Sequence, residues 1–212
     1  MRISHNKLFV YVAITKTGST SVRKLLHKYA DIWSKTGEGP FGHHRTAADL
    51  RKTFLEQGWV WEKYFKFSVV RHPLKRAQSV HKYKTRIGSA PPSPYVEEHA
   101  MAFYKDCLDH VKSFHSLDAW IHSGKFNVLP MTHWTHCPTT GNLLLDQWVK
   151  LEDLHNGLHS VWEKLNLDVD DLDEIPILNS SDLTTGTEML SRSSENWLRE
   201  RFKTDFEAFG YE

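Results

Sequence analysis

Two short polar segments of the sequence carry residues that could bind phosphate groups. The first is Thr15–Ser21 (Thr-Lys-Thr-Gly-Ser-Thr-Ser), which follows an apolar run at Leu8–Ile14. Gly18 lets the backbone approach an anion closely, and Lys16 adds a positive charge. Backbone amides and hydroxyls at the expected start of a helix add further donors: Thr17, Ser19, Thr20 and Ser21. The segment predicts a phosphate cradle, although an ordinary polar turn between a strand and a helix would use similar residues.

This first segment departs from the phosphate-binding loop of nucleoside triphosphatases. That loop needs a glycine, four residues, and then Gly-Lys-Ser/Thr. Here Lys16 precedes Gly18 by two positions, and Ala13 stands where the first glycine would be. The usual magnesium site of that loop is therefore not predicted. A sulfuryl group carries about one charge where a phosphoryl group carries about two, so a lysine and backbone donors can suffice for it.

The second segment is Arg71–Tyr83, which begins where another apolar run ends. Arginine grips a phosphate through two parallel hydrogen bonds, and Arg71 is placed to do so. Ser79 adds a hydroxyl two helical turns into the following segment. Taken alone, this is also the pattern of a basic, solvated helix start. Paired with the first segment, it predicts a site for a nucleotide that bears both a 5′ and a 3′ phosphate.

Strands and helices are expected to alternate along the chain. Apolar, β-branched runs predict strands at Lys7–Ile14, Phe65–Val70 and Phe126–Leu129, and an extended segment at Leu143–Leu151. Helices are predicted between them, over these segments: about Ser19–Tyr29, Thr46–Gly58, Pro73–Tyr83, one that contains Tyr104–Phe114, one that contains Leu158–Leu165, and about Ser194–Gly210. This order predicts an α/β fold with a central parallel sheet, whose ligands bind beyond the carboxyl ends of the strands.

Composition places the chain among soluble globular proteins. Its 212 residues, 40% of them hydrophobic, suit a single domain over residues 1–212. A net charge of +1 gives no general attraction to nucleic acid, so no nucleic-acid partner is expected. No signal peptide or transmembrane segment is predicted. Cys107 and Cys137 are expected to be reduced thiols, which favours a cytoplasmic location, and a single disulfide between them is the alternative.

Both segments resemble motifs of sulfotransferases. Val12–Ser21 is similar to their 5′-phosphosulfate-binding loop, usually written Pro-Lys-x-Gly-Ser/Thr-Thr, with Thr15 in place of the proline. Val70–Ser79 is similar to their 3′-phosphate motif, Arg-x-Pro-x-x-Arg-x-x-Ser. The resemblance to the carbohydrate-type branch extends over most of the chain, through these further segments: His44–Ala47, Leu151–Leu154, Leu178–Ser181 and Asp205–Tyr211.

The resemblance implies a fold like that of P-loop kinases in outline, and sulfuryl transfer from 3′-phosphoadenosine 5′-phosphosulfate to an acceptor hydroxyl, expected to be on a carbohydrate. The product nucleotide would be adenosine 3′,5′-bisphosphate, and no metal is expected. Lys16 would stabilise the charge on the departing phosphate. The segment Thr17–Ser21 would hold the 5′ phosphate, and Arg71 and Ser79 the 3′ phosphate.

A general base must also remove the proton of the acceptor hydroxyl. His44 is the first candidate, because it lies near the predicted start of the helix at Thr46, where the helix dipole disfavours the imidazolium. His43 and Glu62 remain alternatives, and His44 could instead only pack in its loop.

Two other function classes remain open on the sequence alone. A nucleotide or small-molecule kinase would use ATP with magnesium, and a non-catalytic nucleotide-binding module would bind without turnover. The His133-x-x-His136-Cys137 segment could begin a metal site, but it lacks a clear fourth ligand, so a polar loop is favoured.

Overall fold

The computed structural model describes residues 1–35, 37–90, 98–175 and 189–212, and the chain forms two compact units. The first unit contains Met1–His72, Leu129–Asn179 and Thr204–Glu212. The second contains Pro73–Val128 and Ser180–Lys203. The expectation of a single domain over the whole chain stays a prediction.

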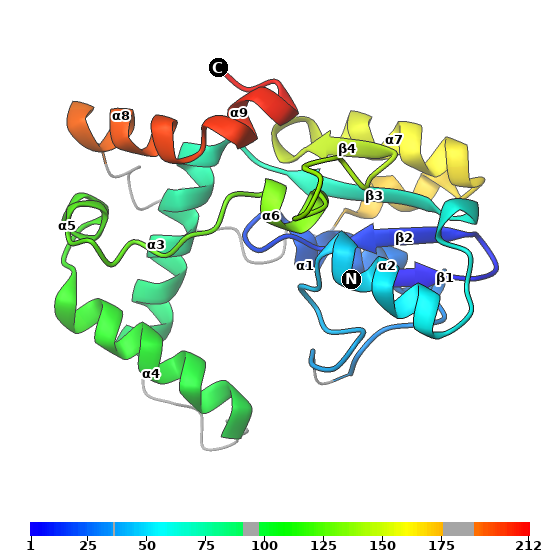
Figure 1. Cartoon of the computed structure of the whole chain (residues 1–212), viewed down its shortest axis with the longest axis horizontal. Coiled ribbons are helices and arrows are strands. Elements are labelled where there is room, and N and C mark those ends of the chain that lie inside the picture. Colours follow the sequence, from blue (N-terminus) through cyan, green and yellow to red (C-terminus); the bar gives the residue numbers. More distant parts are fainter. Residues whose placement is uncertain (36, 91–97, 176–188) are drawn as a thin grey trace. The chain divides into compact units, whose positions relative to one another are not determined.

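The first unit is built on a four-stranded sheet in the order β1-β2-β3-β4 (Figure 1). Strands β2 (Phe9–Val12), β3 (Phe65–Val70) and β4 (Gln147–Lys150) are parallel, as predicted. A further strand, β1 (Arg2–Ser4), was not predicted and pairs antiparallel with β2 at one edge of the sheet. Because β2 and β3 are parallel neighbours, their carboxyl ends lie side by side. The segments that follow the two strands therefore leave the sheet at the same end.

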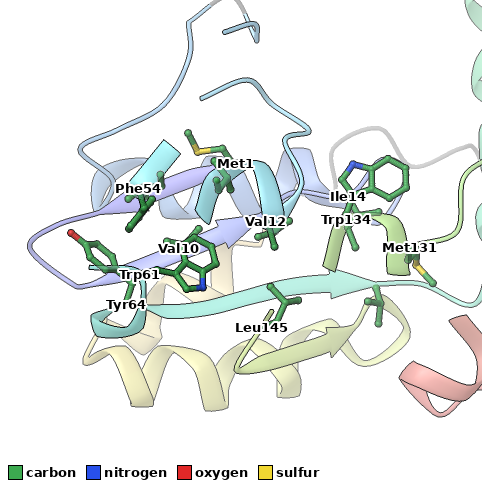
Figure 2. Close-up of a cluster of buried hydrophobic side chains, with 14 of the residues drawn as sticks. Met1, Val10, Val12, Ile14, Phe54, Trp61, Tyr64, Met131, Trp134 and Leu145 are labelled. Carbon is green, nitrogen blue, oxygen red and sulfur yellow. The ribbon is translucent and has the colours of Figure 1, made fainter. Parts of the chain in front are cut away.

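Helices cover both faces of this sheet, so the fold is α/β. On one face, side chains of α1 (Ser19–Leu25) and α7 (Leu154–Leu165) pack against alternate residues of β2, including Phe9 and Tyr11. The opposite face buries Val10 and Val12 together with side chains of α2 (Ala47–Glu56), α6 (Thr132–Thr135) and α9 (Lys203–Phe209). This alternation, shown for the second face in Figure 2, is the period-two pattern of a strand with both faces buried.

The predicted start of α2 is confirmed in detail. The Thr46 hydroxyl accepts a hydrogen bond from the Asp49 amide at 3.0 Å, and the Asp49 carboxylate accepts one from the Thr46 amide at 3.4 Å. This reciprocal pair is a capping box, which satisfies two amides that a helix start leaves without partners. It also fixes where the chain enters α2 from the His43–His44 segment.

The aromatic residues that precede β3 belong to the core. Trp61 and Tyr64 are buried in the cluster of Figure 2, and both meet Phe54 edge to face. Trp59 is half-buried beside them. Four short 3₁₀ turns complete the unit: η1 (Leu26–Lys28), η2 (Trp61–Lys63), η3 (Leu151–Asp153) and η4 (Val169–Glu174).

The second unit is helical and contains α3 (Pro73–Ser89), α4 (Glu98–Ser113), α5 (Leu117–His122) and α8 (Arg192–Arg201). The first two pack closely where Gly88 meets the backbone of Cys107, since a β-carbon at Gly88 would lie 2.2 Å from the Cys107 carbonyl oxygen. The absent side chain of Gly88 therefore permits this close approach.

Three predictions about the elements need correction. Phe126–Leu129 is not a strand. The ring of Phe126 packs edge to face with Trp197 and Phe202 within the second unit, so this apolar residue is explained by packing between side chains and not by a sheet. Helix α3 continues to Ser89 and includes Gly88. The predicted final helix is two helices, α8 and α9, which Phe202 separates. The glycine and prolines of Gly88–Pro94 also predict a break in the chain, of which residues 91–94 lie outside the described residues.

Candidate active site

The turn after β2 has the left-handed conformations that a cradle requires. Lys16 and Gly18 have φ angles of 64° and 74°. Thr17 lies between them, fully buried, and its hydroxyl donates to the Ile14 carbonyl at 3.1 Å. That hydroxyl therefore closes the turn from within, and the loop offers other donors to a ligand.

The first turn of α1 supplies amides. A helix has no internal acceptors for its first amides, and those of Ser19 and Thr20 lie in that turn. The prediction that Ser21 contributes a free amide was wrong, because that amide donates to the Gly18 carbonyl at 3.1 Å. Gly18 is the N-cap, and its carbonyl accepts the first hydrogen bonds of the helix, among them the one from the amide of Ser21. Two amides therefore remain for an anion.

A leucine from a distant part of the sequence lies against this turn. A β-carbon at Gly18 would lie 2.7 Å from Cδ1 of Leu151. The position therefore favours glycine twice, through its positive φ and through this contact. Leu151 follows β4 directly, so the third parallel strand delivers the leucine that packs against the cradle.

The structure brings the two predicted segments together at one point. Arg71 follows β3, and its Nη1 donates to the Lys16 carbonyl oxygen at 3.3 Å. Burial lowers the pKa of Arg71, while the charges of Glu152 and Tyr211 oppose that shift. An arginine remains a cation under these conditions. A permanent positive charge thus lies beside the cradle.

Glu152 organises the segment around Arg71. Its Oε1 accepts the His72 amide at 2.9 Å, and its Oε2 accepts the hydroxyl of Tyr211, also at 2.9 Å. Burial, followed by the charge of Glu152, raises the pKa of Tyr211, so the phenol keeps its proton as this hydrogen bond requires. Neither Glu152 nor Tyr211 was predicted to have a role. The only signal was that both lie in segments similar to those of sulfotransferases.

The role of Ser79 in binding the 3′ phosphate stays a prediction. Ser79 lies in α3, is buried there, and belongs to the second unit. In the first unit, the candidate site consists of the Thr15–Ser21 turn and Arg71, together with Glu152 and Tyr211.

The ring of His44 lies against the end of β2. Its Nδ1 is 2.8 Å from the carbonyl oxygen of Ala13. A carbonyl oxygen can only accept, so Nδ1 carries the proton and Nε2 of the neutral ring keeps a lone pair. Burial, most of all, lowers the pKa of His44 to about 4, with the charge of Arg23 acting in the same direction. The ring is therefore neutral at physiological pH.

The two alternative bases lie in different surroundings. Burial and the charge of Arg23 also lower the pKa of His43 to about 4, and its amide donates to the Gly37 carbonyl at 2.9 Å. Glu62 is exposed in η2 and forms a surface ion pair with Arg51 at 3.6 Å. No described contact connects Glu62 with the turn after β2, whereas His44 contacts Ala13, the residue that follows β2.

Metal ligands do not cluster in the part of the chain that the structure describes, where no three His, Cys, Asp or Glu side chains gather as a metal site. His136 instead pairs through Nδ1 with the Thr135 hydroxyl at 2.8 Å. Cys107 and Cys137 are free thiols. Among the described helices, none is both long enough and apolar enough to cross a membrane.

Comparisons with known proteins agree with this geometry. Neither a search of curated proteins nor a search of solved structures gave a match. A family model described as the sulfotransferase family matches residues 1–212, the whole of the sequence. With a strand–turn–helix cradle and a neighbouring arginine at the ends of parallel strands, the chain belongs to the sulfotransferase family.

Proposed function

We propose that the chain transfers a sulfuryl group from 3′-phosphoadenosine 5′-phosphosulfate to a hydroxyl of an acceptor. The observation that supports this best is the 3.3 Å contact between Arg71 Nη1 and the Lys16 carbonyl oxygen. It joins two anion-binding segments at the ends of neighbouring parallel strands. A nucleotide with phosphates on both the 5′ and the 3′ position requires two such segments.

In this proposal the donor substrate is held mainly by the first unit. The amides of Ser19 and Thr20 bind the 5′ phosphate, which Gly18 allows to approach the backbone. Arg71 binds the 3′ phosphate as a charge-assisted pair, and Glu152 holds the amide of the next residue, His72. The hydroxyl of Ser79, in the second unit, keeps the phosphate-binding role that its sequence motif predicts. No magnesium is needed, because lysine, arginine and backbone donors neutralise the groups that the cradle holds.

The reaction is an in-line displacement at sulfur. The acceptor oxygen forms a bond to sulfur while the bond from sulfur to the phosphate oxygen breaks, and adenosine 3′,5′-bisphosphate leaves. Lys16 stabilises the negative charge that develops on this departing oxygen. The hydroxyl proton passes to Nε2 of His44, whose other nitrogen is held by Ala13.

A carbohydrate is the proposed acceptor. The support is the similarity of the segments around His44 and Leu151 to the carbohydrate-type branch, together with their positions beside the cradle. The free thiols of Cys107 and Cys137 support a reducing, cytoplasmic setting.

Two rival functions make different predictions about the same turn. A kinase would need magnesium, but Ala13 replaces the first glycine of the usual nucleoside-triphosphate loop. A non-catalytic module would bind the nucleotide without needing a lysine at the leaving oxygen or a neutral histidine beside β2.

Ligand binding and turnover test the proposal together. Adenosine 3′,5′-bisphosphate should raise the melting temperature through mass action, and adenosine 5′-monophosphate should do so far less because it lacks the 3′ phosphate. Equal shifts would contradict the role of Arg71. Transfer of labelled sulfate to a panel of glycans, phenols and alcohols in the presence of EDTA would separate a sulfotransferase from both rivals, and phosphate transfer from ATP with magnesium would contradict the proposal.

A further inference from the structure

A second cationic cluster lies under α1, on one face of the sheet. Arg2 of β1 is paired directly with Tyr11 of β2 in the antiparallel register. Side chains of such a pair project from the same face. Tyr11 packs in the same buried cluster as Val22 of α1, so this is the face that α1 covers. Arg23 extends from α1 and interacts electrostatically with both Tyr11 and Arg2.

Two polar atoms of this cluster are buried without partners. Tyr11 is fully buried, and its hydroxyl forms no hydrogen bond to the residues that the structure describes. The same holds for Nε of Arg2. A buried donor left unpaired destabilises a protein by about 1–3 kcal/mol. Two such donors on paired residues indicate an acceptor that the described residues do not supply.

Among the described residues, the charge of the cluster is also uncompensated. Over the described ranges, neither Arg2 nor Arg23 has a carboxylate within ion-pair distance. Arg23 reaches only neutral acceptors, the Ser19 carbonyl at 3.3 Å and the Thr20 hydroxyl at 3.4 Å. The guanidinium of Arg2 lies over the ring of Trp33 at 5.9 Å. Partly buried cations without a counter-charge are unfavourable, and an anion would offset that cost.

We propose that Arg2, Arg23 and the Tyr11 hydroxyl bind an oxyanion, that is, a carboxylate, sulfate or phosphate group. Guanidinium groups and a phenol hydroxyl are donors that match the oxygens of such a group. Burial raises the pKa of Tyr11, so its hydroxyl stays a donor at physiological pH.

The oxyanion has two possible sources. Arg23 contacts the first turn of α1, and its charge acts on His43 and His44. The cluster thus lies beside the proposed base, where an acidic group of the acceptor would be bound; this source rests on the proposed function. The other source is a free inorganic ion, which does not depend on that function.

The test measures melting temperatures of the full chain with the donor site filled by saturating adenosine 3′,5′-bisphosphate. The probes are sodium sulfate against sodium chloride at equal ionic strength, and methyl glucuronoside against methyl glucoside. We expect sulfate, the glucuronoside or both to raise the melting temperature more than the matched control does. Sulfate also stabilises proteins by exclusion from their surface, so only a response to sulfate that Arg23→Gln loses identifies a free ion as a ligand. A response to the glucuronoside alone identifies an acidic group on a sugar.

Three variants assign the response to the cluster. Arg23→Gln should weaken the apparent affinity for the responding probe tenfold or more, and Lys24→Gln, an exposed neighbour on α1, should leave it unchanged. Tyr11→Phe should weaken the affinity for the probe several-fold. Without probe, its melting temperature should match or exceed that of the wild type, since it removes an unpaired buried hydroxyl.

The inference is overturned if neither probe exceeds its control, or if Tyr11→Phe and Arg23→Gln respond as the wild type does. Failure of sulfuryl transfer alone would overturn the proposed function and leave this binding result intact.

Discussion

Gly18→Ala tests whether the cradle is built as described. The substitution forces a β-carbon into a backbone with φ of 74°, which destabilises the folded state by about 1–2 kcal/mol. The new atom would also lie 2.7 Å from Cδ1 of Leu151. Because this atom ends a flexible side chain, displacement from its rotamer adds only about 0.5–1.5 kcal/mol. The total is about 1.5–3.5 kcal/mol, or roughly 3–14 °C in melting temperature for a chain of this size.

A matched glycine separates the two contributions. Gly58 has φ of 71°, and a β-carbon there would meet nothing within 4 Å. Gly58→Ala should therefore show the backbone contribution alone. In urea denaturation, Gly18→Ala should lose about 0.5–1.5 kcal/mol more than Gly58→Ala, and Leu151→Ala in the same chain should abolish this difference.

Nucleotide binding should distinguish the same two variants. Gly18→Ala should weaken the binding of adenosine 3′,5′-bisphosphate, since the amides of Ser19 and Thr20 move with the turn, whereas Gly58→Ala should not. If Gly18→Ala lost no more stability than Gly58→Ala, and Leu151→Ala made no difference, the contact between Gly18 and Leu151 would be refuted.

Three further predictions concern the groups around the cradle. Arg71→Ala should weaken nucleotide binding by a few kcal/mol, whereas Lys16→Ala should lower single-turnover rates at saturating donor more than it lowers affinity; an unchanged rate would exclude the role of Lys16. His44→Ala should keep nucleotide binding and lose roughly 100-fold or more in rate. Since the lowered pKa keeps this ring neutral above pH 4, the wild-type kcat/KM should fall only as pH drops through about 4, and this limb should vanish in the variant. Tyr211→Phe removes the hydrogen bond to Glu152 and should weaken nucleotide binding several-fold, by about 1 kcal/mol, in calorimetric titration; unchanged affinity would show that Glu152 holds the segment around Arg71 without it.

Local patterns in the sequence predicted the elements that carry the site. The apolar run before Thr15 predicted a strand that is buried on both faces, and Thr46 was predicted to begin α2. Such features depend on residues within a few positions of one another, so the sequence expresses them directly. The same reasoning failed at Phe126–Leu129, where an apolar run serves helix packing, because periodicity does not distinguish a short strand from a buried irregular segment.

Contacts between distant residues were decided by the tertiary structure alone. Glu152 accepts the amide of His72 across 80 positions, and Leu151 packs against Gly18 across more than a hundred. The pairing of Arg2 with Tyr11, which gathers the second cationic cluster, depends on an antiparallel edge strand that no local signal announced. A sequence specifies which residues can donate, accept or carry charge. Which of them meet depends on strand order and register, because these set the neighbours of each strand end, and they follow from the packing of the whole sheet.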